Sequence, residues 1–196
     1  DQEIAEDAYH TPYIRPLVQP KFRREKKGLT PAERGTATHL VLQYLDLQNL
    51  DVPGQVEKLR LEAKLTAEQA AAVDVPALRR FLESPLAEEM RQAETAAREY
   101  RFTVLMPARD YDPAAAEEDS ILLQGVVDCW FETPKGVTVV DFKTDFVQTE
   151  EDVAQHAELY RGQLAAYSLA LERVLEKAVT RKALYFLQAG KTVEIS

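Results

Sequence analysis

The sequence predicts an α/β domain with a mixed central sheet flanked by helices and an additional helical region near the N-terminus. Three observations support this fold class. Capping boxes mark helix starts at Thr30 and Thr66. Apolar and polar residues alternate from Arg98 onward, with the period of two that is typical of a strand. The expected elements follow the order helices, three strands, a long helix and two strands, which indicates an α/β or α+β domain.

Residues 1–29 precede the first expected element and show no apolar periodicity. They contain Pro12, Pro16 and Pro20, so we expect an extended linker or a surface arm. The stretch 15–27 within it is locally basic and is opposed only by Glu25. Its cationic residues are Arg15, Lys21, Arg23, Arg24, Lys26 and Lys27. A solvated linker explains this cluster more simply than an arm that grips DNA.

The first helix begins at Thr30 and is expected to run to about Leu45. The segment Thr30-Pro31-Ala32-Glu33 combines an N-cap, a proline at the first helical position and a glutamate at the third. Gly35 and His39 lie four residues apart and therefore share one helix face. A glycine one turn before the histidine lets a neighbour approach this face closely.

Several short helices are expected in residues 50–96. Thr66 opens one of them, and Ser84-Pro85 caps another that is expected from Leu86 to about Ala96. The region lacks a catalytic cluster and suits a helical insert that covers one side of the core. We therefore expect a single domain over residues 30–196, with residues 50–96 as an insert within it.

The remaining elements are expected to form the sheet and its crossover helix. Tyr100, Phe102, Val104 and Met106 alternate with mostly polar residues in the first strand, and an acidic loop covers 110–119. Further strands are expected at 121–132 and 137–143, joined by a turn at 133–136. A long helix should run from Thr149 to about 177, followed by a hairpin of 183–187 and 192–195.

The chemically informative residues lie on the two strands around the 133–136 turn. Asp141 and Lys143 are two residues apart, so on a strand they share a face while Phe142 points the other way. Asp128 can lie beside them on the neighbouring strand. Two carboxylates can hold a divalent cation for phosphodiester hydrolysis, with the backbone carbonyl of Phe142 as a further ligand. Lys143 can then touch the phosphate or orient the attacking water.

Four other residues are candidates for the same site, each with a structural alternative. His39 is either a further ligand, in which case the site should accommodate Mn²⁺ easily, or a hydrogen-bonded structural histidine. Gln163 and Tyr167 share one face of the long helix and either reach the site or pack in the core. Glu99 projects from the first strand opposite the apolar set and is either catalytic or simply solvated.

Composition narrows the functional classes. The net charge of −9 argues mildly against a free-standing nucleic-acid binder but not against a nuclease with an acidic metal site. Cys129 is the only cysteine, so disulfides within the chain and a cysteine-ligated iron–sulfur cluster are excluded. We read Cys129 as a buried apolar residue facing away from Asp128. A reducing, cytoplasmic setting is expected.

The start of the chain predicts a larger parent protein, because the sequence begins at Asp1 without a methionine or signal peptide. No apolar run is long enough to span a bilayer. A Gly-rich phosphate loop of the P-loop type is absent, which sets that chemistry aside.

Five elements resemble, in their order, the RecB-type nucleases of the PD-(D/E)XK, or restriction-endonuclease-like, superfamily over roughly residues 31–196. They are Gly35-x-x-x-His39, Glu99-x-x-Phe102, Gly125-Val126-Val127-Asp128, Asp141-Phe142-Lys143-Thr144 and Gln163-x-x-x-Tyr167. The longer segments 34–39, 98–103, 124–129 and 141–145 are similar to the nuclease domains of the AddA family of bacterial helicase–nuclease subunits.

The resemblance implies a nuclease core with roles for each matching residue. His39, Asp128 and Asp141 would bind the metal, Lys143 would be catalytic, and Gln163 and Tyr167 would complete the site. It also implies an Mg²⁺-dependent deoxyribonuclease of exonuclease type, with Mn²⁺ also supporting activity and no iron–sulfur cluster.

The biological setting follows from the same resemblance. The domain would cut single-stranded DNA unwound by the remainder of a parent helicase chain, beside an AddB-type partner subunit, in double-strand-break repair. The location would be the bacterial cytoplasm, at the nucleoid. Two alternatives remain: a nuclease-like module that docks and guides DNA without strong activity, and a phosphohydrolase that acts on small nucleotides.

Overall fold

A computed structural model describes residues 28–110, 112–145, 147 and 149–195. The basic cluster and nearly all of the expected N-terminal arm lie outside these residues. Within the described part of the chain, no helix is both long and apolar enough to cross a membrane.

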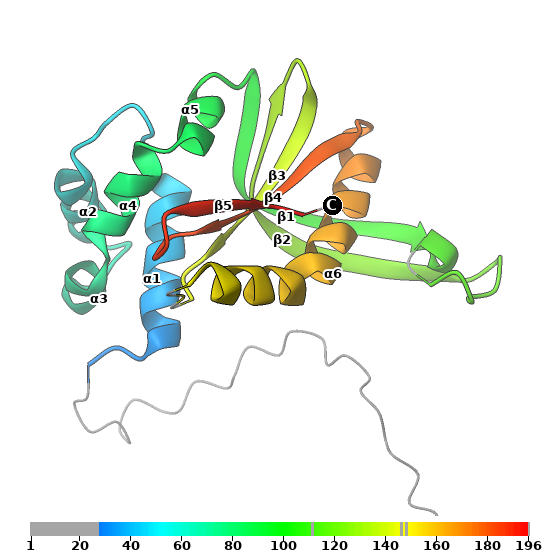
Figure 1. The fold of residues 1–196 in the computed structure, drawn as a ribbon, viewed down its shortest axis with the longest axis horizontal. Coiled ribbons are helices and arrows are strands. Elements are labelled where there is room, and N and C mark those ends of the chain that lie inside the picture. Colours follow the sequence, from blue (N-terminus) through cyan, green and yellow to red (C-terminus); the bar gives the residue numbers. More distant parts are fainter. Residues whose placement is uncertain (1–27, 111, 146, 148, 196) are drawn as a thin grey trace, which may run out of the picture.

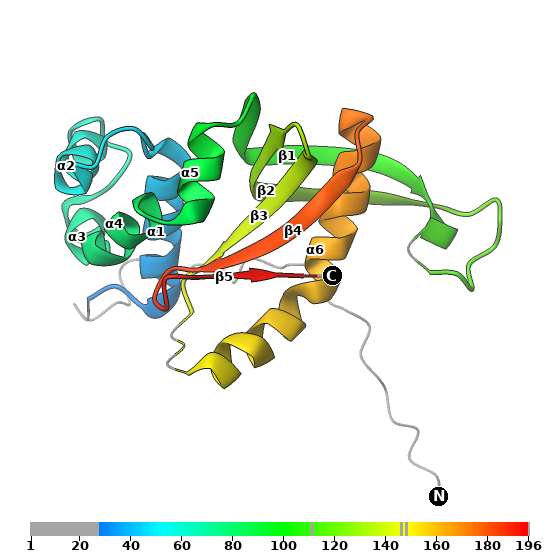
Figure 2. The same ribbon diagram turned by 45° about the horizontal axis from the view of Figure 1, so that its top comes forward.

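A five-stranded mixed sheet forms the centre of the molecule (Figures 1 and 2). The strands lie in chain order: β1 (Thr95–Pro107), β2 (Ser120–Thr133), β3 (Gly136–Lys143), β4 (Val179–Phe186) and β5 (Lys191–Glu194). Neighbouring strands are antiparallel except β3 and β4, which are parallel. The parallel pair needs a crossover, which α6 (Glu150–Leu175) supplies. The predicted mixed sheet is therefore confirmed.

Helices cover both faces of the sheet. The N-terminal group comprises α1 (Pro31–Tyr44), α2 (Val52–Leu61), α3 (Ala67–Ala72), α4 (Val75–Leu82) and α5 (Pro85–Arg91). Figure 1 shows this group at one side of the sheet, while α6 runs beside the strands at another. The predicted capping boxes at Thr30 and Thr66 are present, and Thr149 forms a third with Asp152.

Two predicted boundaries are wrong, and sheet pairing explains both. The helix expected to reach about Ala96 ends at Arg91, because Ala96 pairs with Phe131 in the β1–β2 ladder. The strand expected from Ala183 begins at Val179, which pairs with Val137. Helix propensity, even that of alanine, is a weak preference, and long-range strand pairing overrides it.

The helical region 50–96 shares one core with the sheet. The Phe81 ring on α4 meets the rings of Phe142 and Tyr185 edge-on at centroid distances of 5.1 and 5.0 Å. Arg80 also donates hydrogen bonds to the carbonyls of Leu187 and Gln188, beside the β4–β5 turn. The region therefore packs as an integral layer on the sheet.

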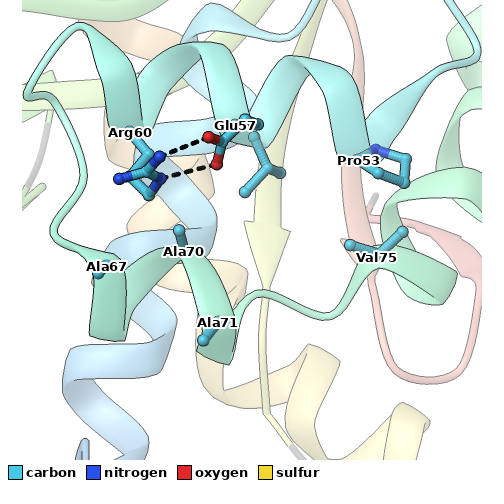
Figure 3. Close-up of a pocket in the computed structure, with 8 residues that line it drawn as sticks. Pro53, Glu57, Arg60, Ala67, Ala70, Ala71 and Val75 are labelled. Carbon is cyan, nitrogen blue, oxygen red and sulfur yellow. Dashed lines mark hydrogen bonds and ion pairs between the residues drawn. The ribbon is translucent and has the colours of Figure 1, made fainter.

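The outer side of this region has a shallow hollow of about 340 Å³ between α2, α3 and α4 (Figure 3). Alanine methyl groups line much of it, and a two-pronged ion pair joins Glu57 to Arg60, with Nε 2.7 Å from Oε2. None of the predicted site residues lines this hollow.

Candidate active site

The β2 and β3 strands separate at the two predicted carboxylates. Their last paired position is Cys129 opposite Val140, so the next position places Asp128 opposite Asp141. Here the backbone N–H of Phe142 donates to Oδ2 of Asp128 at 2.8 Å, in place of a strand carbonyl. The side chain of Asp128 thus occupies the point where the ladder ends. This position brings both acids to the edge of the gap between the strands.

Glu99 extends this row of acids onto β1. The pairs Arg98–Cys129 and Tyr100–Val127 flank a position at which Glu99 lies opposite Asp128 without regular pairing. Glu99 also has a φ of +49°, in the left-handed region that costs a glutamate free energy. Strained backbone of this kind often accompanies functional sites.

At the irregular position of Glu99 and Asp128, the alternation of side chains between the two faces of the sheet shifts by one residue in both β1 and β2. On β1, Ala97 and Tyr100 pack in the cluster that faces α6, although they are three residues apart. On β2, Val127 and Trp130 do the same. The sheet therefore bends at the row of acids, and Cys129 is buried on the opposite side, as predicted. Burial raises the pKa of its thiol to about 12.

Asp141 and Lys143 lie side by side, as the strand period predicted. Nζ of Lys143 is 2.6 Å from Oδ2 of Asp141, and both side chains are nearly buried. Phe142 points to the opposite, apolar side. Burial and the negative charge of Asp128 raise the pKa of the Asp141 carboxyl to about 6, although Lys143 acts in the opposite direction. Asp141 and Lys143 therefore form a buried ion pair in which burial and the nearby Asp128 destabilise the ionised form of Asp141.

His39 reaches the carboxylates from α1. Its Nδ1 lies 3.4 Å from Oδ2 of Asp128. Burial alone would lower the pKa of the imidazole, but the hydrogen bond and charge of Asp128, with the charge of Asp141, raise it. A cationic imidazole would repel a metal ion, so metal binding here requires the neutral form.

Two contacts fix α1 relative to the sheet. Arg98 on β1 donates to the carbonyls of Leu42 and Leu45 at the end of α1, at 2.9 and 2.5 Å. Gly35 faces the loop after β3: a Cβ on it would lie 2.9 Å from Oγ1 of Thr144. The glycine one turn before His39 therefore admits Thr144, which confirms that this face is closely approached.

Tyr160 on α6 joins the site, although no sequence motif singled it out. Nζ of Lys143 lies over its ring, 3.3 Å from the centroid. Its hydroxyl donates to Oδ2 of Asp145 at 3.0 Å. Burial first, and then Asp145, raises the pKa of the phenol to about 12. The available signal was its position three residues before Gln163 on the same helix face.

Gln163 and Tyr167 contact each other on α6. Nε2 of Gln163 donates to the hydroxyl of Tyr167 at 3.1 Å. The Tyr167 ring packs edge-on against Phe102, and a Cβ on Gly125 would lie 3.0 Å from that ring. Packing thus explains Tyr167 and Gly125, whereas a catalytic role for either α6 residue stays a prediction.

The oxygen and nitrogen atoms gathered at this site are ligands suited to a divalent cation. In the described part of the chain, no three His, Cys, Asp or Glu side chains form a group ready to hold a metal. The buried Oδ2 of Asp141 has the Lys143 ammonium 2.6 Å away but accepts no further hydrogen bond from the described residues. Asp141 is also destabilised by its burial beside Asp128. A hard cation between Asp128 and Asp141 would relieve both costs, with His39 and the Phe142 carbonyl as candidate additional ligands.

Comparison with known proteins agrees with this geometry. Residues 8–194 match the model of the PD-(D/E)XK nuclease superfamily. The chain is 39% identical over 97% of its length to the A-type subunit of the ATP-dependent helicase/nuclease of Acetivibrio thermocellus. It is 36% identical over its full length to the protein of the same name from Ruminiclostridium cellulolyticum, and 36% over 97% to that from Bacillus cytotoxicus. The chain spans only 16 to 17% of the length of these relatives.

Proposed function

The chain belongs to the PD-(D/E)XK nuclease superfamily, and on this basis we propose that it is a metal-dependent deoxyribonuclease that hydrolyses single-stranded DNA as an exonuclease. The observation that carries the proposal is the opposition of Asp128 and Asp141 where β2 and β3 separate, with Lys143 beside them. This arrangement presents two acids and one cation at one edge of the gap between the strands.

We assign the metal ligands to Asp128, Asp141, His39 and the carbonyl of Phe142. When bound, Mg²⁺ or Mn²⁺ supplies Lewis acidity that neutralises phosphate charge and activates water. Asp128 and Asp141 carry the negative charge that would balance the charge of the cation. The Phe142 N–H donates to the Asp128 carboxylate at 2.8 Å and holds it in place. The neutral form of His39, which metal binding would require, lies against the same oxygen, with Nδ1 3.4 Å from Oδ2 of Asp128.

Lys143 is the group that acts on the substrate in this proposal. Its ammonium is close enough to Asp141 to face the same scissile phosphate, whose developing negative charge it would stabilise. Glu99, opposite Asp128, would orient the attacking water, and Gln163 with Tyr167 would hold the DNA strand on the α6 side. These last roles rest on position in the fold and on the family resemblance.

The relatives' name supports a wider setting for the whole protein. As parts of ATP-dependent helicase/nuclease subunits, related domains are carried on a much longer chain. We propose that this domain likewise cuts a strand unwound by an AddA-type helicase, beside an AddB-type partner subunit, in bacterial double-strand-break repair. This setting would place it in the cytoplasm at the nucleoid. It would also explain the net charge of −9, because other parts of the complex would hold the DNA.

The test is cleavage of an end-labelled single-stranded oligonucleotide with Mg²⁺ or Mn²⁺, and with EDTA as the metal-free control. Asp141→Ala and Lys143→Ala should each lower the rate at least about a hundredfold. The exposed residues Asp119 and Lys135 offer matched controls, and Asp119→Ala and Lys135→Ala should cut like the original chain. Equal cleavage by all four variants would refute the proposed site. Parallel assays with mononucleotides separate a DNase from a phosphohydrolase on small nucleotides.

The acidic charge and the lack of a preassembled metal cluster in the described residues favour one second candidate, a docking module that guides DNA. Titration calorimetry with Mn²⁺ distinguishes the two. Heat that saturates and disappears in Asp128→Asn supports the nuclease, whereas no binding at millimolar metal supports the docking module.

A further inference from the structure

We propose that Tyr160 is a positioning residue that holds the Lys143 ammonium in the site through its ring and the following loop through its hydroxyl. The inference deepens the proposed function, because it concerns the lysine to which that function assigns phosphate contact. It starts from two contacts made by one side chain. The ring face meets Lys143, 3.3 Å from Nζ to the centroid, and the hydroxyl meets Asp145 at 3.0 Å.

The first contact matters because a lysine is difficult to hold in one place. Its side chain is a flexible four-carbon stem with a point charge, and it lacks the planar fork that orients arginine. In this structure the ammonium lies between two partners: the Asp141 carboxylate at 2.6 Å and the Tyr160 ring. An aromatic face attracts a cation through its quadrupole, and more strongly when water is excluded. Here the Lys143 side chain is 12% exposed and Tyr160 is half-buried.

The two partners of Lys143 are not equivalent. Asp141 is also a proposed metal ligand, and a carboxylate engaged there interacts less with a lysine. The Tyr160 ring is neutral and does not compete for metal. It therefore keeps Nζ beside the carboxylates when Asp141 is otherwise engaged, which is the state in which Lys143 must face the phosphate.

The second contact fixes the backbone that follows Lys143. Asp145 is tied to α6 by the Tyr160 hydroxyl, and Thr144 lies against Gly35 of α1. The segment 143–145 is thus held between two helices that approach from different sides of the sheet. Its three consecutive side chains contact the ring, α1 and the hydroxyl in turn. A tyrosine phenol is protonated at neutral pH in any case, and burial beside Asp145 raises the pKa of Tyr160 further, to about 12, so its hydroxyl is available as a donor.

The chain offers a matched control for the ring contact. Nζ of Lys64 lies 4.2 Å from the centroid of the Tyr44 ring, on the helical region, and Tyr44 is 46% exposed. The two pairs share their chemistry but differ in location. A change at Tyr44 therefore reports what the loss of a cation–aromatic contact does when it lies outside the site.

The first experiment needs neither metal nor DNA. The metal-free chain is treated with limiting acetic anhydride, and acetylation of Lys143 and Lys64 is followed by peptide mass spectrometry. We expect Tyr160→Leu to speed acetylation of Lys143 about tenfold and to leave Lys64 unchanged. Tyr44→Leu should leave Lys143 unchanged. An unchanged Lys143 rate in Tyr160→Leu overturns the inference.

The second experiment measures kcat and KM on single-stranded DNA with Mn²⁺. Tyr160→Leu should lower kcat about tenfold or more and change KM less than about twofold, because the lysine acts on the reacting phosphate. Tyr160→Phe keeps the ring but loses the Asp145 contact, so it should lower kcat about twofold, well short of the loss in Tyr160→Leu. Tyr44→Leu should match the original chain.

The outcomes separate this inference from the proposed function. If the original chain cuts no DNA, the proposed function fails, and the acetylation rates alone decide the role of Tyr160. If the original chain cuts and Tyr160→Leu cuts equally well, the inference fails and the nuclease stands. If circular dichroism shows that Tyr160→Leu does not fold, Tyr160→Phe and Asp145→Ala decide instead. Both variants must lower kcat while KM is retained. A kcat equal to that of the original chain in both variants overturns the role of the hydroxyl contact.

Discussion

Asp128 and Asp141 lie opposite each other at the first unpaired position of the β2–β3 ladder, one residue beyond Cys129 and Val140. The Asp128 carboxylate replaces a backbone acceptor for the Phe142 N–H, so it has a structural partner as well as a proposed ligand role. Two substitutions at this residue separate these roles.

Asp128→Asn should abolish cleavage yet leave the metal-free chain as stable as before or more stable. The amide oxygen can still accept from Phe142, and the loss of one negative charge relieves Asp141. Asp128→Ala removes the acceptor and should cost about 1–3 kcal/mol of unfolding free energy. Urea unfolding at pH 7.5 with EDTA measures both. Equal destabilisation by the two variants would contradict the hydrogen-bond role.

The stability of the metal-free chain should fall as pH rises from about 4 to above 6. The pKa of Asp141 is raised to about 6 in the folded state, so its contribution is fully present below the unfolded value of 3.8 and is lost as pH rises through 6. The full loss is roughly 3 kcal/mol. The raised pKa of His39 acts in the same direction near neutral pH.

Asp141→Asn isolates the part of this pH-dependent loss of stability that comes from the Asp141 carboxylate. Chemical unfolding of the variant at pH 5 and pH 7.5 should show much less pH dependence than the original chain. A decline of the same size in both proteins would assign the effect to other groups.

Gly35→Ala should lower cleavage, and Thr144→Ala should restore it. The added methyl would lie 2.9 Å from Oγ1 of Thr144 and would displace the loop that follows Lys143. Alanine also favours the helix by about 1 kcal/mol over glycine, so the double variant should be more stable than the original chain. A four-protein cycle of unfolding free energies and cleavage rates measures the coupling. Strictly additive effects would show that the two residues are independent.

Cys129 should react with thiol reagents only after unfolding. It is fully buried at the last β2–β3 pair, and burial raises the pKa of its thiol to about 12, so little thiolate is present at pH 8. The reaction with Ellman's reagent should be slow in buffer and should accelerate through the urea unfolding transition. Fast labelling of the folded chain would contradict the burial.

Local patterns were enough to predict helix starts and strand alternation. Capping boxes depend on residues within one turn, so those at Thr30 and Thr66 are readable from sequence and are present in the structure. Strand spacing also placed Asp141 beside Lys143. The helix expected to reach Ala96 failed because its end depends on pairing with β2, a contact of long sequence separation.

The amino-acid order alone identified the acids, the lysine and the family, because these depend on residue types and short spacings. Tertiary structure decided how they act together. It set the β2–β3 ladder to end at Asp128 and Asp141 and placed Glu99 in the same row with strained backbone. It also brought the Tyr160 ring over Lys143, a contact that no spacing in the sequence predicts. Periodicity reports which helix face is covered, and only packing reports what covers it.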